Sequence, residues 1–257
     1  MTEFAGKTVV ITGASRGIGE ATARHFAARG ACVVLGARDE ARVQEIAGEL
    51  RKAGAGHALG RACDVSRSDD VKALIDLALE AGGRLDVLVN NAGLIEPIAK
   101  LADSAVEDWG RVVDVNLKGV YHGMRHAIPE MVRQGEGTII NLSSGAATSA
   151  LEGWSHYCAT KAAVLSLTRV ADKEYRDEGV RVIGLSPGTV ATDMQEQIRA
   201  SGINPVSQLS PDAHIPADWV ARAIAWLTRG EADDHLGTDF SLKTDAGREA
   251  VGLPPLA

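Results

Sequence analysis

The chain has 257 residues, a formal net charge of −7 and 45% hydrophobic residues. This length is compatible with one or two domains, and no linker, low-complexity tract or internal repeat divides it. The acidic balance argues against a general surface for nucleic acids, and no run of about 18 apolar residues indicates a membrane span. Residues 1–7 lack the pattern of a signal peptide. We therefore expect a single cytoplasmic domain, residues 1–257, that binds neither nucleic acid nor membrane.

Strand and helix patterns alternate along the chain. Residues 8–11 (TVVI) form a β-branched run typical of a buried strand, expected over 7–12, and a helical pattern follows from Glu20 to Ala28. Amphipathic helices such as 43–50 and 71–79 lie between later strands. The alternation predicts an α/β fold with a doubly wound parallel sheet of about seven strands and helices on both faces. The six later strands are expected at residues 31–36, 58–63, 87–90, 138–142, 180–185 and 238–242.

A glycine-rich turn, TGASRGIG at residues 12–19, joins the first strand to the first helix. Gly13 permits a tight turn, and Gly17 and Gly19 allow backbone and helix to approach closely. The helix N-terminus offers free N–H groups and a positive dipole to a pyrophosphate. Strand, turn and helix therefore predict a phosphate site, although the spacing is Gly-x-x-x-Gly-x-Gly and a structural turn is the alternative. The candidate ligands are Gly13, Ser15, Arg16, Gly17, Ile18 and Gly19.

Tyr157 and Lys161 lie four residues apart, on one face of a predicted helix. A neighbouring ammonium favours phenolate and lowers the pKa of a tyrosine, which is near 10 in isolation. A pKa lower by about 2–3 would make Tyr157 a proton donor and acceptor near neutral pH. The alternative is a half-buried tyrosine beside a solvated lysine. Ser144 lies thirteen residues upstream of Tyr157.

Further motifs follow in order along the chain: Asp64-Val65, Asn90-Asn91-Ala92-Gly93, Asn116 within DVNL, and Pro187-Gly188. With these motifs the chain resembles the classical, single-domain short-chain dehydrogenase/reductase family from about residue 4 to residue 247. The resemblance implies a Rossmann-type fold and a nicotinamide cofactor. The catalytic residues that it implies are Asn116, Ser144, Tyr157 and Lys161.

Each of these four residues has an implied role. Tyr157 would protonate the developing alkoxide, while Lys161 would lower the pKa of Tyr157 and hold the nicotinamide ribose. Ser144 would donate a hydrogen bond to the carbonyl oxygen; Ser143 is its rival, but the spacing to Tyr157 favours Ser144. Asn116 resembles the residue that holds a water in the proton relay, and its alternative role is to satisfy backbone groups at a helix kink. No catalytic metal is expected.

The resemblance also implies cofactor contacts along the length of the dinucleotide. Asp64 and Val65 would flank the adenine, although Asp64 could instead cap the following turn. The residues implied for the ribose and the centre of the sheet are Asn91, Ala92 and Gly93. The residues implied for the nicotinamide are Pro187, Gly188, Val190 and Thr192, and a plain turn at Pro187-Gly188 is the alternative.

Charge at the end of the second strand indicates which cofactor is used. NAD-binding folds place an acidic residue there for the ribose 2′-hydroxyl, whereas a 2′-phosphate needs a basic residue. The family's acid would be expected at Ala37, and Arg38 follows it. Arg16 is a second cation able to reach the same place, and two arginines can clamp a phosphate. NADP(H) is therefore predicted, with a surface pairing of Arg38 to Asp39 or Glu40 as the alternative.

The substrate region resembles the sepiapterin reductase and benzil reductase-like branch at residues 91–97, 143–147, 153–157 and 187–199. Members of that branch reduce ketones next to a second carbonyl or an aromatic group. The resemblance predicts an NADPH-dependent carbonyl reductase that acts on a bulky, aryl or 1,2-dicarbonyl ketone and gives a secondary alcohol. Ala146 leaves room beside Ser144, and Trp154 and Leu151 could instead be packing or interface residues. The apolar wall is predicted to include Leu94, Ile95, Leu151, Trp154 and Met194.

Two other functions compete with this prediction. A 3-oxoacyl carrier-protein reductase would have basic residues near its entrance for an acidic carrier, and Glu178 stands where such reductases often carry arginine. A non-catalytic NADP-sensing protein on the same fold is the second alternative, because fold does not fix function. Such sensors usually lack the Tyr/Lys pair that this chain retains.

Cysteine and histidine spacing give no metal signal. Cys32, Cys63 and Cys158 are isolated, which predicts reduced thiols in a cytosolic protein. His122 and His126 are four apart, but no carboxylate or cysteine cluster accompanies them. No metal site is predicted.

The last third of the chain carries two further expectations. Residues 189–216 have weak periodicity and several turn residues, which predicts a lid over the substrate; a static loop is the alternative. The family is usually dimeric or tetrameric through helices near 103–133 and 155–178, so a homodimer or homotetramer is expected. The tail after Thr244 departs from the glycine-rich ending common in the family.

Overall fold

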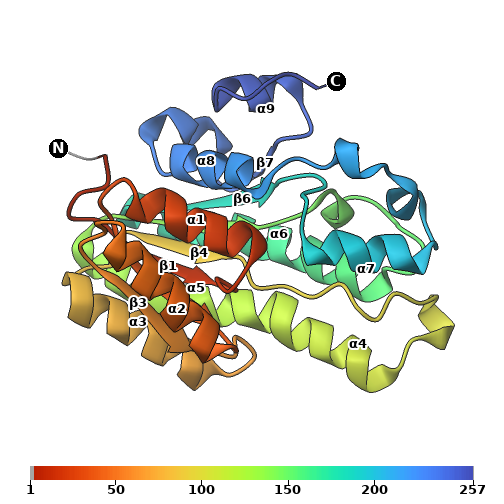
Figure 1. Ribbon diagram of the computed structural model, residues 1–257, viewed down its shortest axis with the longest axis horizontal. Helices are drawn as coiled ribbons and strands as arrows, with labels where there is room; N and C mark the ends of the chain where they lie inside the picture. Colours follow the sequence, from red (N-terminus) through yellow and green to blue (C-terminus); the bar gives the residue numbers. More distant parts are fainter. Residues whose placement is uncertain (1–2, 257) are drawn as a thin grey trace.

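The computed structural model describes residues 3–256 and is built around one parallel sheet (Figure 1). The seven strands lie in the order β3-β2-β1-β4-β5-β6-β7, and every neighbouring pair is parallel. The predicted α/β fold class is confirmed, and each expected strand is present to within one residue at each end. The strands are β1 (Thr8–Thr12), β2 (Cys32–Ala37), β3 (Ala58–Ala62), β4 (Val87–Asn90), β5 (Gly137–Leu142), β6 (Val180–Ser186) and β7 (Asp239–Ser241).

Helices cover both faces of the sheet (Figure 1). One face packs against α1 (Gly17–Ala27), α2 (Glu40–Lys52) and α8 (Ala217–Leu227). The other packs against α3 (Ser68–Gly82), α5 (Gly119–Gln134) and α6 (Ser155–Tyr175). The remaining helices and short helical turns are α4 (Val106–Val113), α7 (Asp193–Ser201), α9 (Asp245–Ala250), η1 (Leu101–Asp103), η2 (Asp114–Lys118), η3 (Gly145–Ala147), η4 (Arg176–Glu178), η5 (Pro205–Gln208), η6 (Pro211–Ala213) and η7 (Gly230–His235).

Successive residues of a strand point to opposite faces, and the two cores divide β1 accordingly. Ile11 packs in the core that contains Phe26 of α1, whereas Val10 packs in the core that contains Leu74 of α3. All four side chains are fully buried. Coverage on both faces explains why the strands read as unbroken apolar runs.

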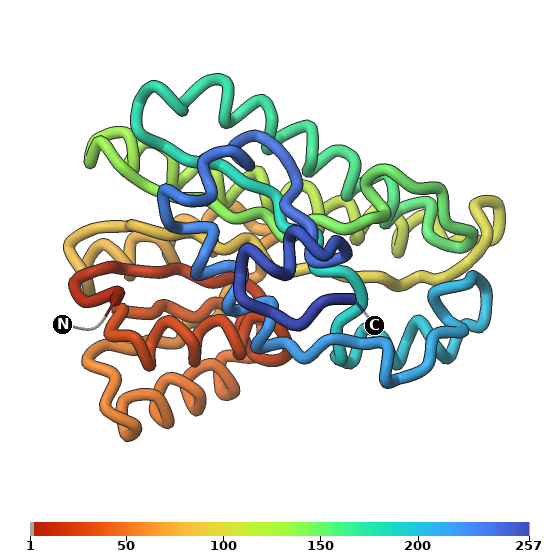
Figure 2. Tube along the Cα trace, turned by 90° about the horizontal axis from the view of Figure 1, so that it is seen from above, coloured from red at the N-terminus to blue at the C-terminus, as the bar shows by residue number. Residues whose placement is uncertain are grey.

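The order of the strands reverses between β1 and β4, so the loops that leave these strands diverge. In open α/β sheets such a switch point at the carboxyl ends of the strands is where ligands bind. Seen from above, the long excursion from β6 through α7 extends along the same end of the molecule as the loop that follows β4 (Figure 2). The fold thus gathers the predicted site residues at one edge of the sheet.

The segment predicted as a lid is more regular than expected. Residues 189–216 hold the nine-residue helix α7 and the turns η5 and η6, and an isolated bridge pairs Val190 with Ile215. In α7, Ile198 is the buried residue. A helix that buries so little carries a weak apolar period, which explains why the sequence did not reveal it. Among residues 3–256 no helix is both long and apolar enough to cross a bilayer.

The turns that end α5 and η4 meet at the amino edge of the sheet. Gly135 and Gly179 adopt φ of +75° and +86°, and Gly137 N donates to Gly179 O at 3.1 Å. A Cβ on Gly179 would overlap the carbonyl oxygen of Gly135. Both the left-handed backbone and the close approach therefore require glycine at position 179.

We expect Gly179→Ala to lower the free energy of unfolding by about 2–4 kcal/mol, because strain and overlap add. Gly54→Ala is the matched control, since Gly54 has φ of +96° but open space around it; it should cost only about 1 kcal/mol. Urea unfolding of both variants measures the difference. Equal losses would contradict a role for the contact with Gly135.

Candidate active site

Three loops meet at the glycine turn. Gly13 has φ of +65°, and a Cβ there would lie 2.8 Å from Cα of Ala92 in the loop after β4. Gly17 has φ of +56°, and its Cβ would lie 3.1 Å from Cγ2 of Thr192, before α7. The fold therefore brings together residues that are far apart in the sequence and that the family resemblance assigns to one cofactor.

Asn91 joins the loop after β4 to the glycine turn by hydrogen bonds. Its Nδ2 donates to Thr12 O at 2.9 Å and to Gly13 O at 3.1 Å. The backbone amides of Asn91 and Ala92 donate to Thr12 Oγ1 at 3.1 and 3.2 Å. The side-chain amide of Asn91 thus shapes the turn, and Ala92 and Gly93 continue the chain beside it.

The N-terminus of α1 is open to an anion. The helix starts at Gly17, and its N-cap residue Arg16 is extended and makes no side-chain capping bond. Ser15 and Ile18, both partly exposed, flank this start. Backbone N–H groups without a cap, next to glycines that admit close approach, fit a pyrophosphate. The residues present therefore fit a dinucleotide.

The two predicted arginines behave differently. Arg16 Nη1 pairs with Asp193 Oδ2 of α7 at 2.7 Å. Arg38 is exposed and forms no ion pair within residues 3–256, so the alternative pairing with Asp39 or Glu40 is absent. Asp39 instead accepts a hydrogen bond from Arg42 N at 3.0 Å as the N-cap of α2.

Asp64 lies close enough to Arg38 to sense its charge. Burial alone would raise the pKa of Asp64, but hydrogen bonds from Ser66 and the positive charge of Arg38 outweigh it and the pKa is lowered. Asp64 Oδ1 accepts from Ser66 N at 3.0 Å and from Ser66 Oγ at 2.7 Å. The alternative capping role of Asp64 is thus present. Val65 is buried against Gly119 at the start of α5.

Tyr157 and Lys161 share one face of α6, as predicted, and both are buried, at 8% and 5% exposure. Lys161 Nζ lies 5.6 Å from the centroid of the Tyr157 ring, within the range of a cation–π contact. The ammonium also donates to Leu142 O, at the end of β5, at 2.6 Å. The helix therefore places the pair against the carboxyl edge of the sheet.

The expected lowering of the Tyr157 pKa is wrong for this structure. Burial raises the pKa of Tyr157 to about 12, and the Ser144 hydroxyl opposes this rise. Burial also lowers the pKa of Lys161 to about 8, against the attraction of the Asp239 carboxylate. Both shifts have the same cause, because removal from water disfavours the charged form of each group.

The two adjacent serines have separate partners. Ser143 Oγ donates to Asp239 Oδ2 of β7 at 2.6 Å. Ser144 lies at the start of η3, where its Oγ accepts from Ala146 N at 3.2 Å, and its hydroxyl acts on Tyr157. The geometry therefore supports the choice of Ser144 over Ser143.

Asn116 is fully buried in η2, a π-helical turn between α4 and α5. Its Oδ1 accepts from Leu94 N at 2.8 Å and its Nδ2 donates to Leu94 O at 2.9 Å. A longer contact of 3.5 Å joins Nδ2 to Thr160 Oγ1 of α6. Asn116 thus satisfies backbone groups at a helix kink, the alternative noted above, and fixes the loop after β4 beside the catalytic helix.

The predicted apolar wall forms around Tyr157, except for Leu94. Ala146 and Trp154 belong to a buried cluster with Tyr157, and the Trp154 and Tyr157 rings meet edge to face at 5.5 Å. Leu94, whose backbone is hydrogen-bonded to Asn116, lies outside this cluster, whereas Ile95, also predicted, belongs to it. The other members are Leu151, Met194, Ile98, Cys158, Ile198 and Val206. Of these, Ile98, Ile198 and Val206 lie in loops or in weakly periodic helix, and no sequence signal marks them.

The loop after β6 completes the site. Pro187 and Val190 are buried, and Thr192 packs against Gly17. Gly188 has φ of +80°, and a Cβ there would lie 2.9 Å from Cγ of Lys243. The turn at Pro187-Gly188 therefore also contacts the loop after β7, a neighbour that the sequence did not indicate.

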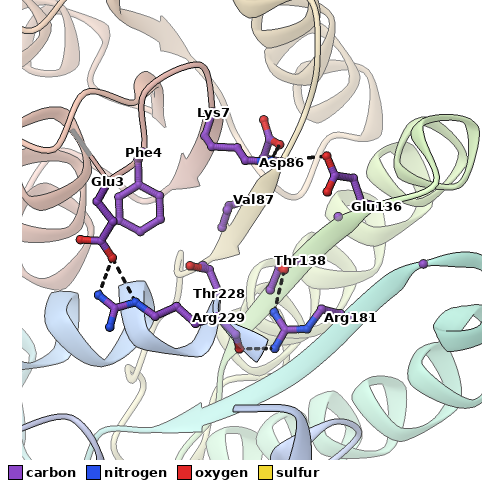
Figure 3. Close-up of a pocket in the computed structure, with 12 residues that line it drawn as sticks. Glu3, Phe4, Lys7, Asp86, Val87, Glu136, Thr138, Arg181, Thr228 and Arg229 are labelled. Carbon is purple, nitrogen blue, oxygen red and sulfur yellow. Dashed lines mark hydrogen bonds and ion pairs between the residues drawn. The ribbon is translucent and has the colours of Figure 1, made fainter. Parts of the chain in front are cut away.

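A separate cavity of about 300 Å³ lies at the opposite, amino edge of the sheet (Figure 3). Its charged side chains are paired: Lys7 with Asp86 at 2.8 Å, and Arg229 with Glu3. Arg181 Nη1 donates to Thr138 Oγ1 at 3.2 Å. This cavity is therefore separate from Tyr157, Lys161 and Ser144, which lie at the carboxyl edge.

No metal cluster of three or more His, Cys, Asp or Glu side chains occurs among residues 3–256. His122 Nδ1 lies 2.9 Å from Val65 O, and His126 Nε2 lies 2.9 Å from Ser68 Oγ. The two histidines noted in the sequence therefore each contact a polar atom of a neighbouring segment of the chain. The three cysteines are free thiols.

A family model described as short chain dehydrogenase matches residues 7–202. The chain belongs to the short-chain dehydrogenase family. Among its relatives, 3beta-hydroxysteroid dehydrogenase 1 of Eggerthella lenta is 39% identical over 95% of this chain and 94% of its own length. Cis-4-hydroxycyclohexanecarboxylate dehydrogenase of Sinomonas cyclohexanicum is 39% identical over 96% and 98%. A 3-oxoacyl-[acyl-carrier-protein] reductase of Synechocystis is 35% identical over 96% and 98%.

A solved structure, levodione reductase, matches this short-chain dehydrogenase with a TM-score of 0.85 and 24% identity, and covers 96% of this chain and 99% of its own. The likeness confirms the Rossmann-type fold. The chain is thus an oxidoreductase of a family that acts on hydroxyl or carbonyl groups with nicotinamide cofactors.

The buried ammonium of Lys161 is expected to cost stability at neutral pH. Its pKa is about 8 in the folded protein and near 10.5 in the unfolded chain, so unfolding binds a proton between these values and stability rises with pH there. Lys161→Met should therefore be about 1–3 kcal/mol more stable than the parent at pH 7. The gap should shrink as pH rises from about 8 to 10.5.

Urea unfolding at a series of pH values measures this gap. Lys173→Met, at an exposed position of the same helix, should show no such trend. A gap that does not change with pH would contradict the depressed pKa.

Proposed function

We propose that this short-chain dehydrogenase is an NADPH-dependent carbonyl reductase that converts a bulky, aryl or 1,2-dicarbonyl ketone to a secondary alcohol. One observation carries the proposal: Tyr157, Lys161 and Ser144 lie together at the carboxyl edge of the sheet, and Tyr157 is part of an apolar cluster. The nicotinamide cofactor, when bound, supplies the hydride.

The residues divide the proton chemistry between them. A phenol with a pKa of about 12 carries its proton at neutral pH, so Tyr157 acts as the general acid toward the carbonyl oxygen. The Ser144 hydroxyl donates a hydrogen bond to the same oxygen and orients it. Lys161 in its ammonium form binds the ribose hydroxyls and stabilises the phenolate that proton transfer leaves behind. Asn116 holds the surrounding loop in register.

The proton role of Tyr157 has a direct test. Tyr157→Phe removes the hydroxyl and keeps the ring, so kcat should fall by about 10³-fold or more. The dissociation constant for NADPH, measured by nucleotide fluorescence, should change less than about threefold. Ser166→Ala, at an exposed position of the same helix, serves as the control for disturbance of α6. Turnover near the parent level in the phenylalanine variant would assign the proton to another group.

Charge around the second strand supports NADPH. Arg38 is exposed and lacks an ion-pair partner within residues 3–256, and its charge reaches Asp64. Arg16 stands across the turn and pairs with Asp193, from which a 2′-phosphate would draw it away. A guanidinium bound to phosphate forms charge-assisted hydrogen bonds.

Arg38→Ala should raise KM for NADPH by about 10-fold or more and leave KM for NADH within about twofold, because only NADPH carries the 2′-phosphate. Steady-state kinetics with both cofactors measures the ratio. Arg67→Ala, which removes an exposed arginine on α3's N-cap, should leave the ratio unchanged. Equal effects of Arg38→Ala on both cofactors would reject the 2′-phosphate contact.

The side chains near Tyr157 and Ser144 support a bulky ketone as the substrate. Trp154 is buried at 4% exposure beside Tyr157, and small residues at 145–147 leave room near Ser144. Two relatives are named for alcohols on a steroid and on a cyclohexane ring, which also favours a substrate with a carbocyclic ring. The motif resemblance to the sepiapterin and benzil reductase-like branch adds the aryl and 1,2-dicarbonyl classes.

A 3-oxoacyl carrier-protein reductase is the second candidate, favoured by the Synechocystis relative. Glu178 does not bear on this choice, because it ends η4 at the amino edge of the sheet, opposite Tyr157 and Lys161. Loss of NADPH absorbance with aryl diketones and ring ketones, against an acetoacetyl thioester, separates the two. Faster turnover of the thioester would favour the carrier-protein reductase, and binding of NADPH without turnover of any ketone would favour a sensor.

Three accessory properties belong to the same proposal. Residues 189–216 act as a substrate lid, which the Arg16–Asp193 ion pair ties to the glycine turn. The protein assembles as a homodimer or homotetramer, a state supported by the exposed apolar side chains of Val106, Tyr121 and Val170. A cytoplasmic location fits its free thiols.

A further inference from the structure

Strand β7 carries a carboxylate, that of Asp239, whose charge acts on Lys161 of α6. Asp239 Oδ2 accepts a hydrogen bond from Ser143 Oγ at 2.6 Å. Lys161 Nζ donates to the carbonyl of Leu142, the residue before Ser143, at 2.6 Å. The two charges are thus tied to consecutive residues at the carboxyl end of β5, without a direct ion pair within residues 3–256.

The sheet makes room for this carboxylate. Asp239 pairs in register with Gly184 of β6, which pairs with Asn141 of β5. A Cβ at position 184 would overlap Asp239 Oδ1, so the acid extends over the bare backbone of β6 to reach β5. Asp239 and Asn141 are in register and lie on the same face of the sheet. That face is covered by α6, because Asn141 Nδ2 donates to Thr168 Oγ1 of this helix at 3.0 Å.

One oxygen of this carboxylate is poorly satisfied. Asp239 Oδ1 is enclosed and has no hydrogen-bond partner among residues 3–256. A buried carboxylate with an unpaired oxygen is costly unless a nearby positive charge compensates it. Ser143 supplies only one hydrogen bond, so the compensating charge must come from the surroundings.

Among residues 3–256, no other acidic group close to Lys161 is available to stabilise its positive charge. Tyr157 of α6 is a neutral phenol at pH 7 because burial raises its pKa to about 12, and Arg169 of the same helix is a cation. Across from α6, Asp114 and Lys118 of η2 are partly exposed and pair with each other at 2.6 Å. The carboxylate whose charge raises the pKa of Lys161 is that of Asp239, and Lys161 and Arg169 in turn lower the pKa of Asp239, whose burial raises it.

We propose that Asp239 is a positioning residue that keeps Lys161 in its ammonium form and thereby sets the upper pH limit of cofactor binding and turnover. The inference rests on the proposed function, because that function requires the charge of Lys161. It adds a residue outside the Asn-Ser-Tyr-Lys set and assigns a role to Gly184, whose missing side chain lets Asp239 reach the site.

The test measures the protonation of the Lys161 side chain directly. The side-chain ¹⁵N resonance of Lys161, assigned with Lys161→Met, is titrated in the full chain without cofactor. The parent should titrate at about pH 8, and Asp239→Asn should titrate about one pH unit lower, since an opposite charge has been removed. At pH 7.5 the ammonium fraction then falls by about threefold, and the dissociation constant for NADPH rises in parallel.

Two further variants, one that perturbs the same carboxylate and one that serves as a control, complete the experiment. Gly184→Ala keeps the acid but fills the space that its Oδ1 occupies, so it should also lower the Lys161 midpoint, and it answers the question if Asp239→Asn does not fold. Asp172→Asn removes a different buried acid, which lies in α6 and is paired with Arg176 at 3.0 Å. It should lower the melting temperature and leave the Lys161 midpoint unchanged.

The outcomes separate this inference from the proposed function. Unmoved midpoints in both Asp239→Asn and Gly184→Ala overturn the inference even if the protein reduces ketones. A shift in Asp172→Asn as large as that in Asp239→Asn overturns it as well, because the effect would then be non-specific. A low midpoint confined to Asp239→Asn and Gly184→Ala supports it, whatever the substrate proves to be.

Discussion

A lysine ammonium buried against the end of a β-strand is the constraint on which the site depends. Lys161 is almost fully enclosed and is held by the carbonyl of Leu142. Burial disfavours its charge and, a few ångströms away, the charge of the Tyr157 phenolate. The resting site is therefore a neutral phenol beside a weakened ammonium. The proposed function uses this pair to give a proton to a substrate oxygen and to stabilise the anion that remains.

Buried amides and close glycine contacts hold this pair beside the glycine turn after β1. Asn116 fixes the loop after β4 through Leu94, and Asn91 fixes the same loop to the glycine turn. The turn itself is fixed by close approach: the carbonyl of Gly13 lies where a side chain on Gly19 would be. Buried amides and glycines thus set the distances between loops, and the parallel sheet supplies the rigid edge from which all of them leave.

Polar groups inside the two cores mark where function has shaped the packing. Asn90 Nδ2 donates to Asn141 Oδ1 at 2.8 Å, and Asn141 continues to Thr168 on the catalytic helix. Asp239 sits next to this chain of hydrogen bonds and keeps one oxygen unpaired. Apolar side chains of similar size would pack there without such cost. These polar groups lie at the carboxyl ends of β4 and β5 and at the start of β7, beside the proposed chemistry.

Local sequence was enough to predict the strands, the glycine turn and the spacing of Tyr157 and Lys161, because each depends on periodicity or on backbone freedom within a few residues. It also favoured Ser144 over Ser143 by spacing alone. The direction of the Tyr157 pKa shift was predicted wrongly, since burial is a property of the whole fold and outweighs the neighbouring charge. Leu94 was placed in the wall together with Ile95, but only the folded structure shows that Asn116 binds the Leu94 backbone and that Ile95 alone of the two joins the apolar cluster. Asp239 and Gly184 escaped notice because their meeting depends on the register of β6 and β7, and register is fixed only when the sheet is assembled.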